Sequence, residues 1–287
     1  MKPAPFDYVG ATSIDDAVAQ LASGDATVIA GGQTLMPLLA LRMSMPLTVV
    51  DINRVADLRG VSVSDQGVRI GAMTRQADLL TDAALAGALP PLVTAVRHVG
   101  HHQTRNRGTI GGSLVFAEPA AEMPATAVAL GATLELRSAG GTRNVAAETF
   151  YLGPYMTDIV PDELLVAVTF PAWPRHARTV FREVAQRPGD FALVGLVGAV
   201  EIEGGAIARA GLAWFGMGPT PMRARQAESA LVGRAPGDIR ASEIAELAIA
   251  DTDPFDDVHA TAEYRREVGR RVFAQALTAA LAQEGQA

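Results

Sequence analysis

The sequence predicts a protein of two domains, each of which combines helices with strands. Its 287 residues suit about two domains of roughly 150 residues each. A hydrophobic content of 49% with 19% charged residues is ordinary for a chain that folds around a substantial core. The segment 171–180 is polar and interrupted by two prolines, so it marks the expected domain boundary.

Near the N-terminus, helical and strand patterns alternate. Ser13 followed by Asp16 is a capping signal ahead of apolar residues with helical spacing. Pro37 is compatible with a helix only in its first turn. The predicted elements are a helix at 13–23, a strand at 26–30 that runs into glycines, a helix at 34–43 and a strand at 47–52.

The middle of the chain predicts a hairpin, two longer helices and two strands. Apolar and polar residues alternate on both sides of the turn residues 64–67, which is typical of a hairpin. Residues 105–114 are expected to form a loop. The remaining predicted elements are helices at 89–100 and 122–132 and strands at 133–138 and 163–171.

Beyond the boundary, the pattern predicts two strands followed by helices. The strands are joined at Gly204-Gly205 within residues 193–218. Tyr264, Arg265 and Arg266 are expected on the exposed side of the last helix. The predicted helices lie at 222–233, 241–251 and 261–283.

Composition excludes several classes of function. Because the chain has no cysteine, it holds no disulfide, no thiol nucleophile and no cysteine-ligated iron–sulfur cluster. The N-terminus lacks the apolar run of a secretory signal, and the most apolar stretch, 191–200, is too short to span a bilayer. A net charge of −7 argues against nucleic-acid binding. We therefore expect a cytoplasmic protein with no nucleic-acid partner and no membrane insertion.

Gly31-Gly32 lies where a strand turns into a helix. Residues 26–50 around it contain no Asp or Glu. Glycines let backbone N–H groups approach a ligand and form a cradle for an anion, to which the following helix adds its positive end. Gln33 and Thr34 supply further donors. The same glycines would also suit a simple tight turn between packed elements.

The stretch Gly108–Ser113 is the stronger motif. It holds three glycines, a threonine and a serine, and residues 83–117 around it also lack acidic residues. Two such loops suit a ligand with two linked phosphates better than a monophosphate. Neither loop matches the P-loop or the G-x-G-x-x-G pattern. Arg105 and Arg107 could pair with phosphates, face solvent or contact a partner protein.

No residue pattern predicts an acid, a base or a nucleophile, so no catalytic residue is expected in this chain. The adjacent pair His101-His102 has no carboxylate at a suitable spacing, and no metal site is predicted. A cofactor that itself carries the chemistry would explain why such residues are missing.

The motifs "AGGQTLMPLL" at 30–39 and "GHHQTRNRGTIGGSL" at 100–114, with "AEPAAEMPA" at 117–125, resemble the FAD-binding medium subunit of molybdenum hydroxylases. This family includes the flavoprotein subunits of carbon monoxide dehydrogenase and of bacterial N-heterocycle and aldehyde dehydrogenases, and the flavin domain of xanthine dehydrogenase. Residues 216–233 and 262–277 resemble the C-terminal domain of the same family, so the likeness runs nearly end to end.

The resemblance implies an α+β fold. Residues 1–175 would form an FAD-binding domain of the vanillyl-alcohol-oxidase (PCMH) type, with subdomains at about 1–57 and 58–175. Residues 176–287 would form a smaller α+β domain with a three-stranded sheet and helices.

FAD is the cofactor that the resemblance implies. Glu122 stands where relatives have an acid that reaches FAD hydroxyls, and Leu165 matches a position near the flavin or adenine. Phe191 replaces a tyrosine that some relatives place against the isoalloxazine, and Arg182 replaces a lysine. The full set of implied FAD contacts is Ile29, Ala30, Gly31, Gly32, Gln33, Thr34, Leu35, His102, Thr104, Gly108, Thr109, Ile110, Gly111, Gly112, Ser113, Glu122, Leu165, Arg182 and Phe191.

Three functional hypotheses follow. In the first, this is an oxidoreductase subunit that passes electrons from [2Fe-2S] clusters on a small partner subunit through FAD to an external acceptor. A large molybdopterin subunit would oxidise the substrate, and the complex would be a dimer of heterotrimers. The second is a stand-alone FAD-dependent oxidoreductase of the same fold, similar to UDP-N-acetylenolpyruvoylglucosamine reductase. The third is a nucleotide-binding scaffold without redox chemistry.

Overall fold

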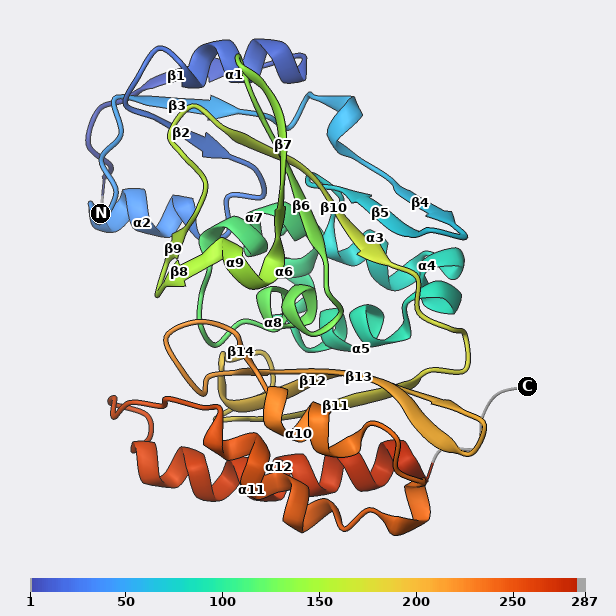
Figure 1. The fold of residues 1–287 in the computed structure, drawn as a ribbon. Coiled ribbons are helices and arrows are strands. Elements are labelled where there is room, and N and C mark those ends of the chain that lie inside the picture. The colour runs from blue at the N-terminus through green and yellow to red at the C-terminus, as the bar shows by residue number, and fades with distance from the viewer. Residues whose placement is uncertain (1, 283–287) are drawn as a thin grey trace.

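The computed structural model describes residues 2–282, in which sheets and helices alternate in layers (Figure 1). The first unit is a small parallel sheet in the order β1-β3-β2. Ser13 caps the first helix by accepting a hydrogen bond from the Asp16 backbone N–H at 3.0 Å. Pro37 lies in the first turn of the second helix, as its chemistry requires. The elements are β1 (Asp7–Gly10), α1 (Ile14–Leu21), β2 (Ala26–Ile29), α2 (Leu35–Leu41) and β3 (Thr48–Asp51).

The second unit is built on a five-stranded antiparallel sheet in the order β4-β5-β10-β6-β7. The predicted hairpin forms its first two strands. The central strand has a register shift between Leu165 and Ala167. The strands are β4 (Val61–Ser64), β5 (Gly67–Gly71), β6 (Thr133–Ser138), β7 (Gly141–Ala146) and β10 (Leu164–Pro171), and a separate small hairpin joins β8 (Tyr151–Gly153) to β9 (Met156–Thr157).

Short helices cover one face of this sheet, and here the sequence-based expectation of a loop at 105–114 is wrong. Two helices occupy the segment, and the Thr109 side chain caps the second one by accepting from the Gly112 N–H at 3.1 Å. Glycines thus sit inside a helix that tertiary packing stabilises. The helices are η1 (Ala56–Leu58), α3 (Gln76–Thr81), α4 (Ala83–Ala88), α5 (Pro90–His98), α6 (His102–Arg107), α7 (Ile110–Phe116), α8 (Glu122–Ala129) and α9 (Ala147–Phe150).

The C-terminal unit pairs an antiparallel sheet with helices. Its three long strands match the expected sheet, and a two-residue strand adds to one edge. Gly204 and Gly205 both have positive φ, 60° and 84°, as a tight hairpin turn needs. The elements are β11 (Arg178–Ala185), β12 (Ala192–Glu203), β13 (Ala206–Phe215), β14 (Met222–Arg223), α10 (Arg225–Leu231), η2 (Pro236–Asp238), α11 (Ala241–Ala250) and α12 (Ala262–Leu281).

Two expectations for this unit need correction. The helix predicted at 222–233 starts at Arg225, because Met222 and Arg223 pair with β13 instead. Arg265 is buried rather than exposed, and it donates to Asp257 Oδ2 at 2.7 Å and to the Gly216 carbonyl at 3.0 Å. The last predicted helix residue, 283, lies outside the described residues.

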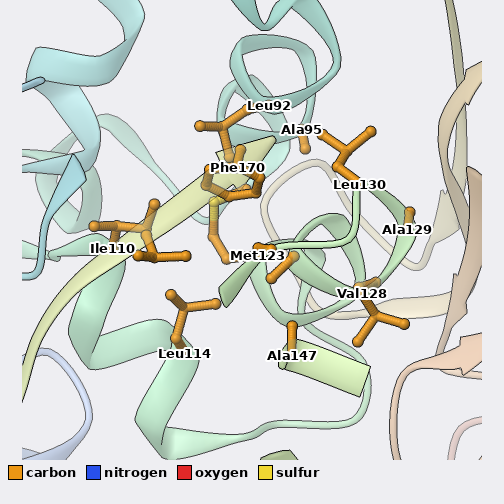
Figure 2. Packing of buried hydrophobic residues seen from close by; sticks show 14 of the residues in the cluster. Leu92, Ala95, Ile110, Leu114, Met123, Val128, Ala129, Leu130, Ala147 and Phe170 are labelled. Carbon is orange, nitrogen blue, oxygen red and sulfur yellow. The ribbon is translucent and has the colours of Figure 1, made fainter. Parts of the chain in front are cut away.

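A continuous hydrophobic core joins the second and third units. Helices α5 and α8 lie between the five-stranded sheet and the C-terminal sheet (Figure 1). Figure 2 shows side chains of α5, α7, α8 and β10 gathered around Met123. Val197 and Ala199 of β12 belong to the same cluster, whereas Leu196 and Val200 face the helices of the C-terminal unit. The strand is therefore buried on both faces. Within residues 2–282, every helix is too short or too polar to cross a membrane.

Candidate functional site

A cavity of about 590 Å³ lies where the three units meet. Its walls come from the β2–α2 turn, from α6, α7 and the start of α8, from the β8–β9 hairpin and β10, and from the turn before β12. This volume is in the range of cavities that hold a cofactor or a drug-sized ligand. Distant segments of the chain therefore create one site, which is partly open to solvent.

The first glycine segment, Gly31-Gly32 between β2 and α2, turns sharply at one wall of this cavity. Gly32 has a positive φ of 72°, which favours glycine. A side-chain carbon on Gly31 would overlap the carbonyl of Arg107. The missing side chain therefore allows the two glycine segments to touch, and the turn at Gly31 serves packing as well as access.

The second glycine segment, Gly108–Ser113, leads into α7 and forms its first turn. Gly111 packs on Ala72, where an added Cβ would come within 2.6 Å of the Ala72 Cβ. At Gly112 the nearest atoms to an added Cβ are Thr109 Oγ1 at 3.0 Å and Ala30 Cβ at 4.0 Å. Gly111 is thus a packing glycine, whereas Gly112 keeps backbone open toward the cavity and the first loop.

Arg105 is not available as a ligand of the cavity. Its Nη1 donates to the carbonyls of Val99 and Gly100, both at 2.9 Å. These carbonyls follow the last residue of α5, so the guanidinium completes the end of that helix. The Arg105 guanidinium therefore stabilises the protein structure here and adds no donor to the cavity.

A buried carboxyl lies at one side of the cavity. Glu122 is only 5% exposed, and burial, with a smaller contribution from the charge of Glu183, raises its pKa to about 8. Burial also raises the pKa of Glu183 to about 7, and His98 Nδ1 lies 3.4 Å from its Oε2. Burial and the neighbouring Arg105 and Arg97 lower the pKa of His98. Near neutral pH, Glu122 is therefore a protonated hydrogen-bond donor.

Aromatic side chains stand at the rim. Tyr155 contacts the ring of Phe116 at 5.1 Å between centroids, and its hydroxyl donates to Glu118 Oε2 at 2.7 Å. Tyr155 also has a positive φ of 57°, a strained conformation for a side chain of this size. Phe191, in the turn before β12, is 60% exposed. Both rings lie against cavity space that a planar ligand could fill.

Most of the residues predicted to bind a ligand do line this cavity. Four do not: Ile110 is buried in the core, Ile29 is half-buried at the end of β2, His102 is exposed beside Asn106, and Arg182 is exposed on β11. Those that line it are Ala30, Gly31, Gly32, Gln33, Thr34, Leu35, Thr104, Gly108, Thr109, Gly111, Gly112, Ser113, Glu122, Leu165 and Phe191.

Comparison with known proteins identifies the family. Residues 4–173 match the FAD binding domain in molybdopterin dehydrogenase, and residues 179–280 match the CO dehydrogenase flavoprotein C-terminal domain. The chain belongs to this family of FAD-binding subunits.

Relatives match along almost the whole chain. The 6-hydroxypseudooxynicotine dehydrogenase complex subunit alpha of Paenarthrobacter nicotinovorans is 40% identical, over 98% of this chain and 96% of its own. The glyceraldehyde dehydrogenase medium chain of Sulfolobus acidocaldarius is 38% identical, over 93% and 95%. The structure of carbon monoxide dehydrogenase from Hydrogenophaga pseudoflava superposes with a TM-score of 0.95 at 34% identity, over 98% and 99%.

FAD is therefore the cofactor of this molybdenum hydroxylase medium subunit, and the geometry suits it. The two glycine segments form a cradle beside the cavity, and the open face of Gly112 is a space that a Cβ would fill. Backbone N–H groups of a glycine turn such as the one at Gly31-Gly32 can hold a phosphate, while protonated Glu122 can donate to a hydroxyl. When bound, FAD supplies the redox chemistry that no side chain of the cavity offers.

Several residues of the site escaped prediction from the sequence. Gln76, Glu118, Tyr155 and Asp190 line the cavity, although no motif marks them. Gln76 is 3% exposed, and its buried Oε1 has no hydrogen-bond partner in the protein. An unpaired buried acceptor is unfavourable, so the Gln76 amide is a further candidate for contact with the cofactor.

Proposed function

We propose that this subunit is an electron-transfer flavoprotein within a molybdenum-containing hydroxylase or dehydrogenase. Substrate is oxidised at the molybdopterin of a large subunit, and electrons pass through [2Fe-2S] clusters of a small subunit to FAD in this chain. An external acceptor then takes them up. The assembly is a dimer of heterotrimers in the cytoplasm, as the sequence predicts, with residues 1–175 and 176–287 as the two domains of this subunit.

The observation that carries the proposal is the composition of the cavity wall. Glycine backbone, Thr109 and apolar side chains form most of it, and of its two buried acids, Glu122 and Glu163, Glu122 is neutral near pH 7. Such a wall binds and orients a redox cofactor. The other acids of the wall, Glu118, Glu163 and Asp190, are held by Tyr155, Arg143 and Arg187 rather than paired with a base for covalent chemistry on a substrate.

The relatives support a partner subunit as the place where the substrate binds. Their names refer to a nicotine derivative, an aldehyde and carbon monoxide, and two of the three are named as a subunit or chain of a larger enzyme. One fold, conserved at 34–40% identity, accompanies three chemically unrelated substrates. The substrate of this complex is therefore selected outside this chain.

Reduction by a partner provides the test. The purified chain should hold FAD but should not turn over with NAD(P)H and an organic substrate. Mixing it with a dithionite-reduced, desalted small [2Fe-2S] subunit should bleach the visible absorbance of the flavin. If the flavin stays oxidised, the electron-transfer role fails. Steady turnover by the isolated chain would instead favour a stand-alone oxidoreductase.

A further inference from the structure

Asn53 and Arg75 connect the two glycine segments from behind the cavity. Neither residue lines the cavity, and both are half-buried. Asn53 follows β3, and its Nδ2 donates to the Ala30 carbonyl at 2.8 Å. This bond fixes the carbonyl at which the first glycine loop begins.

Arg75 completes the link. Its Nη2 donates to Asn53 Oδ1 at 2.6 Å, and its Nη1 donates to the Arg107 carbonyl, directly before Gly108. A planar guanidinium holds two acceptors in a fixed geometry. The chain of contacts therefore runs from Ala30 through Asn53 and Arg75 to Arg107.

Each end of this link is anchored in the fold. Asn53 is held by Asp51, whose Oδ1 accepts from the Asn53 backbone N–H at 2.8 Å. On the other side, the backbone around Arg75 pairs with the second glycine segment, because the Gln76 N–H donates to the Gly108 carbonyl at 2.9 Å. The side-chain link is thus short, stiff and attached to both glycine segments.

We propose that Asn53 and Arg75 form a clamp that sets the separation of the two glycine segments and thereby the affinity for FAD. They are positioning residues, since they act through the backbone of Ala30 and Arg107. The clamp rests on FAD as the cofactor and does not depend on electron transfer to a partner. Its geometric role requires the fork of an arginine, whereas a purely electrostatic role would require only positive charge near the phosphates.

Flavin affinity of the full-length chain, freed of FAD, tests the clamp. Fluorescence titration with FAD should give a dissociation constant at least about tenfold higher for Arg75→Met than for wild type, a loss of ~1.4 kcal/mol. Asn53→Ala should raise the dissociation constant for FAD by a similar factor. Because both residues act as one unit, the double variant should be no weaker than the worse single variant, within about twofold.

Two further variants separate position from charge. Arg59 donates to the Asn53 carbonyl at 2.7 Å and makes neither of the side-chain links to Ala30 and Arg107, so Arg59→Met should keep wild-type affinity within about twofold. Arg75→Lys keeps the charge without the fork and should bind as weakly as Arg75→Met. Melting of each flavin-free variant checks that the titrations are made on folded protein, and Asn53→Ala stands in if Arg75→Met does not fold.

Specific results would overturn the clamp. These are unchanged affinity in Arg75→Met and Asn53→Ala, full rescue by Arg75→Lys, an equal loss in Arg59→Met, or additive losses in the double variant. A wild-type chain that takes up no FAD would refute the cofactor as well as the clamp. Wild-type uptake with unaffected variants would refute the clamp alone.

Discussion

Gly111 and Gly112 are neighbours in one helix but meet different surroundings. A side chain on Gly111 would press into Ala72, whereas one on Gly112 would meet only Thr109 Oγ1 closely and would extend toward Ala30 and the cavity. Gly111 therefore allows close packing against Ala72, whereas Gly112 leaves room for a ligand to approach the backbone. Glycine content alone cannot reveal this division, because both residues look the same in the sequence.

We expect Gly112→Val to weaken FAD binding at least about tenfold, because the added methyl groups occupy the open backbone of the cradle. The flavin-free chain should still fold. Gly111→Val should instead lower thermal stability, since overpacking a tight contact costs ~1–3 kcal/mol. Flavin titration and thermal melting of both variants measure the two effects. Normal flavin occupancy in Gly112→Val would contradict the assignment of the cradle.

The buried Glu122 makes a pH-dependent contribution to stability. Its folded pKa of about 8 exceeds the ordinary value of 4.5, so the folded chain binds this proton more tightly than the unfolded chain does. The contribution is fully present below about pH 4.5 and is lost as the pH rises through about 8. The free energy of unfolding should therefore fall over this interval, on the order of 4–5 kcal/mol from this group.

Glu122→Gln should remove that dependence, because an amide does not titrate. Urea unfolding of the flavin-free chain at pH 5 and pH 8 should show a smaller decrease in the variant than in wild type. Glu183, with its raised pKa, and His98, with its lowered pKa, titrate in both proteins, so the comparison measures Glu122 together with its smaller coupling to Glu183. Equal pH slopes would mean that Glu122 is ionised in the folded chain.

At the scale of elements, the sequence predicts the β-hairpins well. It predicts poorly the short helices and the side-chain contacts between segments that are distant in the chain. The hairpins β4–β5 and β12–β13 follow from local alternation and turn residues, and the glycine segments from their composition. The helices α6 and α7 were missed because glycine and residues such as Thr104 and Asn106 have low helix propensity. In α7, capping by Thr109 and burial of Ile110 outweigh it. The Asn53–Arg75 link was missed because it joins residues far apart in the chain.

In helix α12, the buried charge of Arg265 fixes the first turn of the helix to the neighbouring sheet. Arg265 has a side chain only 6% exposed, and it pairs with Asp257 while donating to carbonyls at the ends of β12 and β13. Helical spacing did not distinguish it from its exposed neighbours. The arginine ties the start of α12 to the sheet, so the loop before the helix and the end of the hairpin form one structural unit.

Replacing Arg265 by methionine should destabilise the chain by ~3 kcal/mol, because Asp257 and two strand-end carbonyls lose their buried partner. Arg271 offers a matched control on the same helix. It pairs with Glu267 but is 74% exposed, and such surface pairs contribute ~0–1 kcal/mol. Urea unfolding of Arg265→Met and Arg271→Met gives the comparison. Equal losses in the free energy of unfolding would show that the buried Arg265–Asp257 pair contributes no more stability than the exposed Arg271–Glu267 pair.

At the scale of the whole molecule, the cofactor site depends on contact between units. The cavity takes its glycine cradle from the first two units and Gly189, Asp190 and Phe191 from the third. The contact between the second and third units is a continuous hydrophobic core, with α8 against β12 and β13. Because such a core resembles a domain interior, the units should not unfold independently.

Gly211 lies at the centre of that contact. An added Cβ would overlap the Ala129 carbonyl at the end of α8 and lie 3.1 Å from the Trp173 ring. Gly211→Val should therefore separate the sheet of the third unit from α8. We expect one calorimetric transition for the flavin-free wild-type chain, a lower and broader or divided transition for the variant, and faster release of FAD from its incomplete cavity. Gly237→Val is the control, because nothing lies within 4 Å of its added Cβ. If wild type itself melts in two steps, or if Gly211→Val retains FAD as well as Gly237→Val, the units are coupled less tightly than their shared core requires.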